Sequence, residues 1–365
     1  MSCVYSNAVQ MPYRNPNTTH LPRLREADSN QARAVLPARP GIGTKATRPL
    51  KQTVHMLNGR LLQTIDQEKF HLDTHAFDFQ RIGDSQVQDW NNVDQIVDVY
   101  FPEVEALIRK HVPGASHPNC KVLIFDHALR SGGTLLKEQQ ADSETWQGYA
   151  GIVHSDATVR SIHSRAKDQI LGTNETLVKY GRYPASWGDV RPTVVWQNKL
   201  FRANHDADHL FPDGEGGEHM IVNLWRPLST VPNWGLGVMD GSSLEQGDVH
   251  PTILNSYDNN PGGLTKGKYK ATSKVFDTTG KAVPIRYGEV LTPLYNENHR
   301  WVYFPEMRKE EGLFLKIFDS RKNIQVRNGC HSAFRDPLAT DTKSHRKSIE
   351  VRCLVIFPKD TKSRL

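Results

Sequence analysis

Five strand-like segments follow one long amphipathic helix, without the alternation of strands and helices that a parallel βαβ sheet requires. The segments are rich in Val, Ile, Leu and Phe, as strands that contribute to a core commonly are. They comprise residues 120–130, 149–157, 219–228, 313–320 and 346–357. This order predicts a mainly β fold, a sandwich or barrel buttressed by helices, and argues against a doubly wound nucleotide-binding fold.

The helix is predicted over residues 91–112, where apolar side chains recur at intervals of three and four after an Asn start signal. Pro102 lies inside this pattern. Because proline removes a helical hydrogen bond and clashes with the preceding turn, we expect a bend or a junction between two helices there.

The N-terminal region differs from the rest in charge and proline content. The first 60 residues hold nine Lys or Arg and two acidic residues, a net charge of +7, so the other 305 residues carry −1 of the total of +6. Six prolines interrupt any long helix before residue 50. We therefore predict an irregular basic arm over residues 1–50 and one domain over residues 51–365, with an insert or lid at about 160–220. No reader motif accompanies the charge, so we expect no nucleic-acid partner.

Composition and cysteine usage narrow the class of protein. The hydrophobic fraction of 37% is typical of a globular chain, and no apolar run approaches the roughly 18 residues of a membrane span. The four cysteines lack CxxC spacing, which favours a reducing compartment over a disulfide framework. The terminal Ser363-Arg364-Leu365 resembles a peroxisomal address. We expect a cytoplasmic or peroxisomal protein with no membrane partner.

A His-Ser-Asp triplet ends the strand-like segment 149–157. Residues two apart in a strand point to the same face, so His154 and Asp156 could hold one metal ion. An imidazole and a carboxylate suit Fe(II), and a second histidine would complete a facial triad with three open positions. The same spacing occurs in His71-Leu72-Asp73, and residues 204–209 (NHDADH) are richer still in ligand types, so the triplet alone does not select the site.

The last predicted strand carries an unusual polar face. Arg346 and Ser348 share that face with Glu350 and Arg352, while apolar residues occupy the other. A guanidinium can bind a carboxylate through two parallel hydrogen bonds, and the hydroxyl adds a third donor, which fits the far carboxylate of 2-oxoglutarate. The alternative is an exposed edge strand in which Glu350 pairs with an arginine.

Six ordered motifs together resemble the fungal hydroxylase/desaturase family, which is related to gibberellin desaturases and to a component of the bacterial cephem methoxylase. The motifs are VHSDAT, VNLWRPL, HRWVYFPEM, LKIFDSR, CHSAFRDP and RKSIEVRCLVIF, and the resemblance covers residues 55–358. It implies a double-stranded β-helix (jelly-roll, cupin-like) core with flanking α-helices, and an oxygenase that uses Fe(II), 2-oxoglutarate and O2. His154, Asp156 and His331 are the implied iron ligands, and Arg346 and Ser348 are the implied 2-oxoglutarate anchor.

The third metal ligand and the roles of two residues in the VNLWRPL motif leave alternatives open. His299 also lies in a family-like motif, but we prefer His331 because its 15-residue step to Arg346 suits a hairpin between adjacent strands. Asn223 and Arg226 could reach substrate or cosubstrate, or form interior hydrogen bonds and ion pairs.

The resemblance also implies the class of reaction and substrate. A small molecule, with amino-acid-derived compounds as one candidate class, would be hydroxylated, desaturated or closed into a ring in secondary metabolism. We expect a monomer or homodimer. The alternative is a non-oxidative metal- or ligand-binding β-barrel, which would have no need of the Arg346/Ser348 pair.

Overall fold

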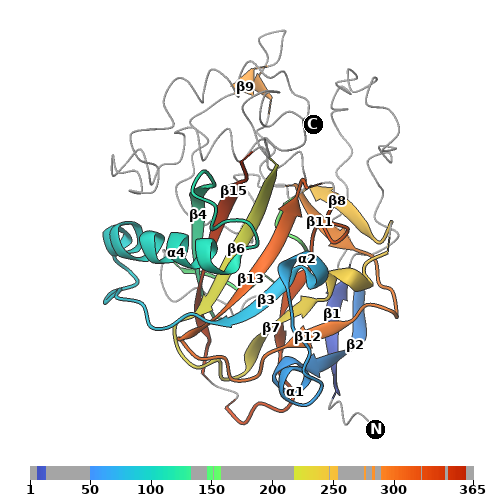
Figure 1. The fold of residues 1–365 in the computed structure, drawn as a ribbon. Coiled ribbons are helices and arrows are strands. Elements are labelled where there is room, and N and C mark those ends of the chain that lie inside the picture. Colours follow the sequence, from blue (N-terminus) through green and yellow to red (C-terminus); the bar gives the residue numbers. More distant parts are fainter. Residues whose placement is uncertain are drawn as a thin grey trace, which may run out of the picture.

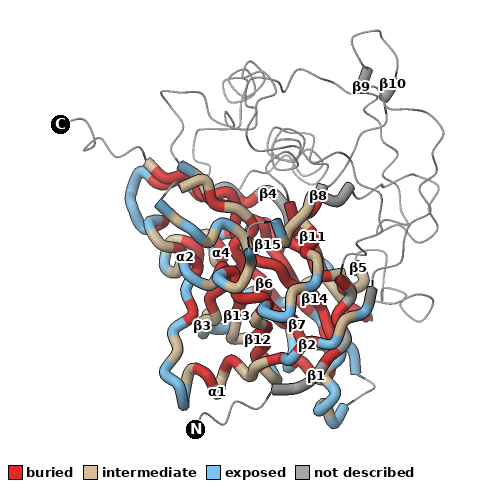
Figure 2. The backbone as a smooth tube through the Cα atoms, turned by 90° about the vertical axis from the view of Figure 1, so that its right-hand side faces the viewer, coloured by how far each residue is buried: buried red, intermediate tan, exposed pale blue. Residues whose placement is uncertain are grey.

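Two β-sheets form the body of the protein in this computed structural model, which describes residues 6–13, 50–132, 146–150, 152–157, 218–245, 247–253, 275–276, 282–283, 289–321, 323–341 and 344–358. The sheets face one another, their strands are largely buried, and α4 lies on the outside (Figures 1 and 2). A core cluster draws side chains from both sheets, including Trp225 and Leu313 from one and Val238 and Val302 from the other. This architecture agrees with the predicted mainly β fold.

The larger sheet has six strands in the order β3-β13-β6-β15-β4-β5. These strands are β3 (Phe77–Arg81), β13 (Glu311–Asp319), β6 (His219–Pro227), β15 (Lys347–Ile356), β4 (Lys121–Ser131) and β5 (Trp146–Gln147). The inner strand β15 pairs antiparallel with β4 on one side and β6 on the other. The edge-strand alternative for the segment after Arg346 is therefore wrong.

The smaller sheet has the order β1-β2-β12-β7-β14. Its strands are β1 (Ser6–Tyr13), β2 (Leu50–Asn58), β12 (Trp301–Tyr303), β7 (Trp234–Met239) and β14 (His331–Arg335). Single bridges at His154 and Ser155 continue it to β11 (Glu289–Pro293), which pairs with β8 (Val249–Ile253). A separate pair joins β9 (Val275–Phe276) to β10 (Ala282–Val283). The segment 152–157 thus lies between β14 and β11.

The helices are short except at the predicted amphipathic position. They are α1 (Gly59–Thr64), α2 (Leu72–His75), α3 (Val93–Gln95), the π-helical segment η1 (Ile96–Tyr100), α4 (Phe101–His111) and the 3-10 turn η5 (Gly241–Ser243). In η1 the Phe101 N–H donates to Ile96 O, five residues back. The wider turn comes directly before Pro102, where an ordinary helical turn would clash with the ring. The expected irregularity at Pro102 is therefore a π-helical segment.

The two faces of β15 differ in polarity, and the polar face lies between the sheets. Ile349, Val351 and Cys353 point outward into a core cluster that includes Val104 and Ile108 of α4. The alternate residues point between the sheets, where polar groups are costly unless they are paired or used. The helix therefore covers the apolar face and leaves the polar face of β15 to the interior.

Three expectations about local structure are wrong. Ser6–Tyr13 of the supposed irregular arm forms β1, whose Val9, Met11 and Tyr13 are buried. The described residues of 149–157, all but residue 151, form isolated bridges at His154 and Ser155 rather than a strand. β14 and β15 belong to different sheets, so the step from His331 to Arg346 crosses between sheets and is not a hairpin.

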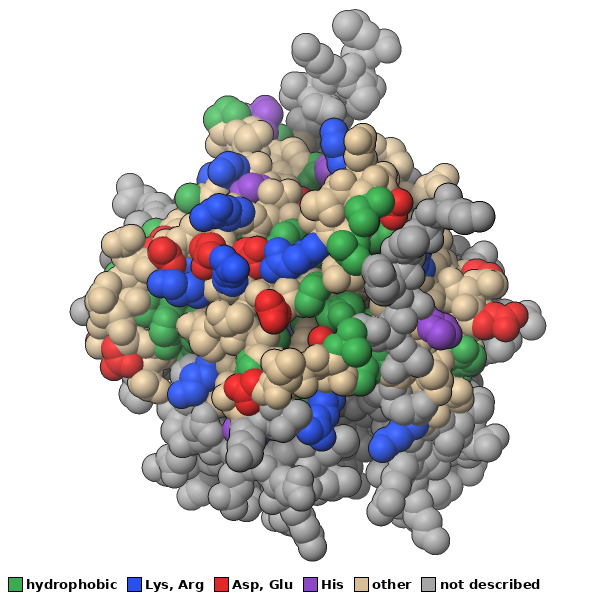
Figure 3. Space-filling view, turned by 90° about the horizontal axis from the view of Figure 1, so that it is seen from below, with side chains coloured by type: hydrophobic (Ala, Val, Ile, Leu, Met, Phe, Trp, Pro, Cys, Tyr) green, Lys and Arg blue, Asp and Glu red, His purple; other side chains and the backbone are tan. Residues whose placement is uncertain are grey.

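Surface charge and helix length bear on the expected lack of nucleic-acid and membrane partners. On the face seen in Figure 3, basic and acidic side chains are interspersed and no patch of one sign dominates. None of the helices in the described part of the chain is long and apolar enough to cross a membrane. Residues 14–49, 158–217 and 359–365 fall outside the described structure, and with them most of the arm, most of the expected lid, the NHDADH stretch and the C-terminal tripeptide.

Candidate metal and 2-oxo acid site

His154 and His331 face each other across two paired segments. The His331 N–H donates to His154 O at 2.8 Å, and the His154 N–H donates to His331 O at 3.1 Å. Residues that exchange both hydrogen bonds lie directly opposite and present their side chains on one face. The two imidazole centroids are accordingly 4.7 Å apart. Register between the segments therefore brings together two histidines that are far apart in the sequence.

Asp156 completes a compact group of three donors. Its Oδ1 lies 3.4 Å from His154 Nε2 and 3.9 Å from His331 Nε2. All three residues are buried, and their candidate ligand atoms lie within 4.8 Å of one another. Neighbouring donors on an octahedral ion would be about 3 Å apart for bonds of about 2.1 Å, so a small inward movement suffices. The donor set fits a 2-His-1-carboxylate site for Fe(II).

Hydrogen bonding and burial prepare these side chains for a cation. His154 Nδ1 lies 2.7 Å from Ile152 O, so this nitrogen carries the proton and Nε2 keeps its lone pair for a metal. Burial lowers the pKa of His331 to about 4, and nearby His154 acts in the same direction, so the imidazole is neutral at pH 7. Burial opposes ionisation of Asp156, but the charge of Arg352 is the largest opposing influence, and the pKa of Asp156 lies well below its usual range.

Arg346 occupies an aromatic box between the sheets. Its guanidinium carbon lies 4.2 Å from the Tyr149 ring centroid and 5.0 Å from that of Trp225. Its Nη1 donates to Trp234 O at 2.9 Å, and the Tyr149 hydroxyl donates to Arg346 O at 2.7 Å. Burial lowers the pKa of Arg346 to about 10, which still leaves the side chain charged at neutral pH. The box holds a fixed cation in the interior.

Two donors beside this box have no partner within the described residues. They are Arg346 Nε and Ser348 Oγ, both fully buried. A buried donor without an acceptor costs free energy, and a buried cation without an anion costs more. The pair therefore suits an anionic ligand, and a carboxylate could accept from both residues.

The three-donor group and the aromatic box contact residues that are two positions apart on β6. On β6, Asn223 Nδ2 donates to Asp156 Oδ2 at 3.0 Å, while Trp225 stacks on Arg346. Residues two apart on a strand are separated by roughly 6.5–7 Å. A five-carbon dicarboxylate has a matching length, so it could reach from the three donors to the guanidinium.

His299, the alternative third ligand, lies elsewhere. Its Nδ1 is 3.3 Å from the Tyr13 hydroxyl and its Nε2 is 3.0 Å from Asp248 Oδ2. Both ring nitrogens are therefore engaged, and His299 is not part of the three-donor group. Arg226 is also away from the site, on the opposite face of β6, where it donates to Gly83 O and Lys309 O.

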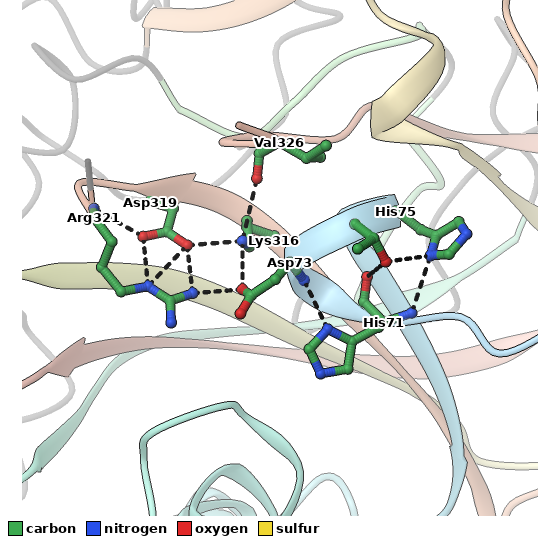
Figure 4. Close-up of polar contacts among 8 residues, drawn as sticks. His71, Asp73, His75, Lys316, Asp319, Arg321 and Val326 are labelled. Carbon is green, nitrogen blue, oxygen red and sulfur yellow. Dashed lines mark hydrogen bonds and ion pairs between the residues drawn. The ribbon is translucent and has the colours of Figure 1, made fainter. Parts of the chain in front are cut away.

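The other His-x-Asp triplet, His71-Leu72-Asp73, has a structural role. His71 caps α2 by accepting from the Asp73 N–H at 3.2 Å. The Asp73 carboxylate accepts from Lys316 Nζ at 2.9 Å and also pairs with Arg321, and Asp319 bonds to the same two cations (Figure 4). This cluster joins α2 to β13 and balances its own charges.

Replacing Asp73 by alanine should lower stability without affecting metal binding. The buried Lys316 would lose one of its two carboxylate partners but keep Asp319 and Val326 O, so we expect a loss of about 1–3 kcal/mol in the free energy of unfolding. Denaturant unfolding measures this change, and Mn(II) titration of the same variant should match the wild type. Loss of the metal in this variant would move the site to His71 and Asp73.

In a second group of possible metal ligands, the carboxylates already form ion pairs with an arginine. Glu68, His75 and Asp240 bring ligand atoms within 4.8 Å of one another. Arg300 lies among them, with Nη1 at 2.6 Å from Glu68 Oε1 and 2.8 Å from Asp240 Oδ2. Because a guanidinium occupies the acceptors, this cluster is an ion-pair network.

The sequence analysis missed several residues of the site. Tyr149, Trp234 and Arg130 were not singled out, and Glu350 was placed on the polar face of the last strand without a role in the site. Arg130 donates to Glu350 Oε1 at 2.8 Å and to Gly148 O at 2.9 Å. Its place opposite Ser348 on β4 comes from strand register, for which the sequence offers no direct signal. Tyr149 precedes the triplet closely in the sequence, and this proximity was a usable signal.

The chain is similar to a family of oxidoreductases and to fungal proteins named as hydroxylase/desaturases and dioxygenases. A family model described as an oxidoreductase/YMDC permease-like domain matches residues 25–186 and 199–356. Hydroxylase/desaturase asaB of Aspergillus flavus is 36% identical over 153 residues, which is 42% of this chain and 60% of that protein. Fe(II)/2-oxoglutarate-dependent dioxygenase nvfI of Aspergillus novofumigatus is 28% identical over 294 residues, 79% of each chain. The matches to asaB and to aspirochlorine biosynthesis protein N of Aspergillus oryzae span 60% and 52% of those proteins.

A solved structure shares the architecture. The iron and alpha-ketoglutarate-dependent endoperoxidase NvfI matches with a TM-score of 0.59 at 17% sequence identity, covering 98% of this chain and 100% of that one. At this identity the likeness concerns the fold alone. The predicted double-stranded β-helix is confirmed.

Proposed function

This chain belongs to the fungal hydroxylase/desaturase family, and on that premise we propose that it is an Fe(II)- and 2-oxoglutarate-dependent oxygenase of a small metabolite. The family resemblance carried by the six sequence motifs is thereby confirmed. In the proposal His154, Asp156 and His331 hold the iron, and Arg346 and Ser348 anchor the far carboxylate of 2-oxoglutarate. Bound iron, 2-oxoglutarate and O2 supply the oxidising power, which no protein side chain provides.

The observation that carries the proposal is the unpaired buried cation beside the three-donor group. Arg346 has no carboxylate partner among the described residues, and Ser348 Oγ has no hydrogen-bond partner there. A barrel that only bound a metal would gain nothing from this costly arrangement. A 2-oxo dicarboxylate accounts for both halves, because its far end would satisfy the guanidinium while its near end reached the metal.

The residues of this chain then have three tasks. The histidines and Asp156 would hold the metal and leave coordination positions for other ligands. Arg346, Ser348 and the aromatic box hold the cosubstrate in one orientation. The two sheets exclude water from the site, since every one of these side chains is buried.

The substrate is a small molecule, and we propose a secondary metabolite that is hydroxylated, desaturated or closed into a ring at a C–H bond. The names of the relatives, which include hydroxylase/desaturases and a dioxygenase, support this range of outcomes. Amino-acid-derived compounds are one class to include among the candidate substrates.

Succinate formation tests this function without knowledge of the substrate. Such enzymes convert 2-oxoglutarate slowly to succinate and CO2 when no substrate is present, so purified chain with Fe(II), 2-oxoglutarate and O2 should form succinate, and a metabolite that is a substrate should speed this up. Omission of Fe(II) or O2 should stop it. A folded, iron-loaded chain that forms no succinate with any metabolite, and does not bind 2-oxoglutarate, would favour the non-oxidative binding protein.

A further inference from the structure

We infer that Arg352 and Asn223 are positioning residues that fix Asp156 as a one-oxygen metal ligand, and that Glu350 and Arg130 hold Arg352 in place. This inference rests on the proposed function, because it assigns Asp156 to the metal. It concerns residues that do not themselves contact metal or cosubstrate.

The two oxygens of Asp156 have different surroundings. Oδ2 accepts from Asn223 Nδ2 at 3.0 Å and from Arg352 Nε at 3.2 Å. Oδ1 faces the two histidine Nε2 atoms and accepts one hydrogen bond, from Arg352 Nη2 at 3.3 Å. A carboxylate can bind a metal through one oxygen or two. Two residues hold Oδ2, whereas Oδ1 is the oxygen nearest the two histidines, so Oδ1 would be the oxygen that binds the metal and a further position would stay available for other ligands.

Glu350 links the residue that orients Asp156 to a second arginine. Its Oε1 accepts from Arg352 Nη2 at 2.9 Å and from Arg130 Nε at 2.8 Å, with Arg130 Nη2 in close contact as well. Burial opposes ionisation of Glu350, but the two guanidinium groups lower its pKa to about 2. The carboxylate is therefore charged and locks both arginines by charge-assisted hydrogen bonds.

The network also ties down the segment that carries two of the metal ligands. Arg130 Nη1 donates to Gly148 O at 2.9 Å, and Arg352 binds Asp156. Arg130 and Arg352 thus attach the two ends of residues 148–156 to the larger sheet, and Glu350 joins these two arginines. Among the described residues of this segment, His154 and Ser155 form isolated bridges, so these contacts of the two arginines add to its attachment.

Strand register explains how Arg352 reaches Asp156. Arg352 lies opposite Asn223 in the β15–β6 pair, so the two donors approach the carboxylate side by side. On its other side, the pairing of β15 with β4 shifts between Arg352 and Cys353. Such bulges redirect a side chain and are common next to active sites.

A positive charge beside a metal ligand would normally repel the incoming cation. Here two arginines, Arg130 and Arg352, are balanced by Glu350 and Asp156, so these four groups carry no net charge before the metal binds. The network thus keeps the orienting donors and cancels most of their repulsion. It also leaves Arg346, which directly precedes β15, as the cation available to a dicarboxylate.

Mn(II) binding to the full chain, followed by electron paramagnetic resonance, tests the inference. Arg352→Met should raise the Mn(II) dissociation constant by about 10- to 100-fold, the usual effect of losing a partner of a metal ligand. The matched control is Arg226→Met, which removes a buried arginine from the opposite face of the neighbouring strand and should change the constant less than about twofold. Arg352→Lys, which retains a cationic donor, should recover part of the affinity.

Two further variants keep the test decisive if Arg352→Met folds poorly. Asn223→Leu and Glu350→Gln should each weaken Mn(II) in the same direction by a smaller factor, with the apoprotein folded by circular dichroism. Wild-type affinity, or tighter binding, in all folded variants of these three positions would overturn the inference while leaving the proposed function intact. Failure of the wild-type chain to bind Mn(II) would instead contradict the proposed function, and the inference with it.

Discussion

Replacing Asp156 by alanine is expected to abolish metal binding, with Fe(II) and Mn(II) affinity reduced by more than about 100-fold. Residues that only support a metal ligand are commonly worth 10- to 100-fold, so loss of the carboxylate itself should exceed that range. The variant also leaves Arg352 without one of its two buried carboxylate partners, so the apoprotein should lose about 3–5 kcal/mol of stability. Asp156→Asn keeps the volume and separates the two effects.

The chain contains its own control for this experiment. Asp73 occupies the same place in the other His-x-Asp triplet and pairs with Lys316 and Arg321. Asp73→Ala should keep the metal and Asp156→Asn should lose it, as measured by Mn(II) titration of folded protein. Retention of full affinity in Asp156→Asn would remove Asp156 from the metal site.

Replacing Arg346 by methionine should weaken 2-oxoglutarate by about 2–5 kcal/mol, or roughly 30- to 5,000-fold, while Mn(II) affinity stays near the wild-type value. The reason is that the guanidinium is the one buried cation beside the three-donor group, within the described residues, that lacks a carboxylate partner. Quenching of tryptophan fluorescence can follow binding, because Trp225 stacks on the guanidinium.

Arg346→Met should not lower the stability of the protein in the absence of 2-oxoglutarate. Removing a buried cation that lacks an anionic partner relieves a desolvation cost, so Arg346→Met should unfold at least as late as the wild type in the absence of 2-oxoglutarate. Arg226→Met, by contrast, breaks hydrogen bonds to two carbonyl groups and should be less stable with unchanged 2-oxoglutarate affinity. Unchanged affinity in Arg346→Met would relocate the anchor to Arg352 or another cation.

Alternation along single strands was the most predictable part of this site. Side chains alternate between the two faces of a strand, so Arg346 could be grouped with Ser348, and His154 with Asp156, from their spacing in the sequence. Pairings between strands were not predictable in this way. His331 was chosen partly for a hairpin that does not exist, and it reaches the group through a bridge to His154.

The missed features have a common physical origin. β1 was interpreted as irregular because Pro12 and the basic residues nearby suggested a solvated arm, yet its Met11 and Tyr13 pack into the core beside β2. Arg130 and Glu350 gained their roles from register across three strands. Long-range pairing overrides local composition in both cases, and a single sequence carries little information about it.

The most direct measurement is an anaerobic titration of the wild-type chain with Fe(II) and 2-oxoglutarate, followed in the visible region. Fe(II) gives a weak charge-transfer absorption when the oxo and carboxylate groups of a 2-oxo acid bind to it together. We expect this band to require both additions, to be missing in Asp156→Asn, and to need far more 2-oxoglutarate in Arg346→Met. A folded, iron-loaded wild-type chain that shows no band at saturating 2-oxoglutarate would contradict the account.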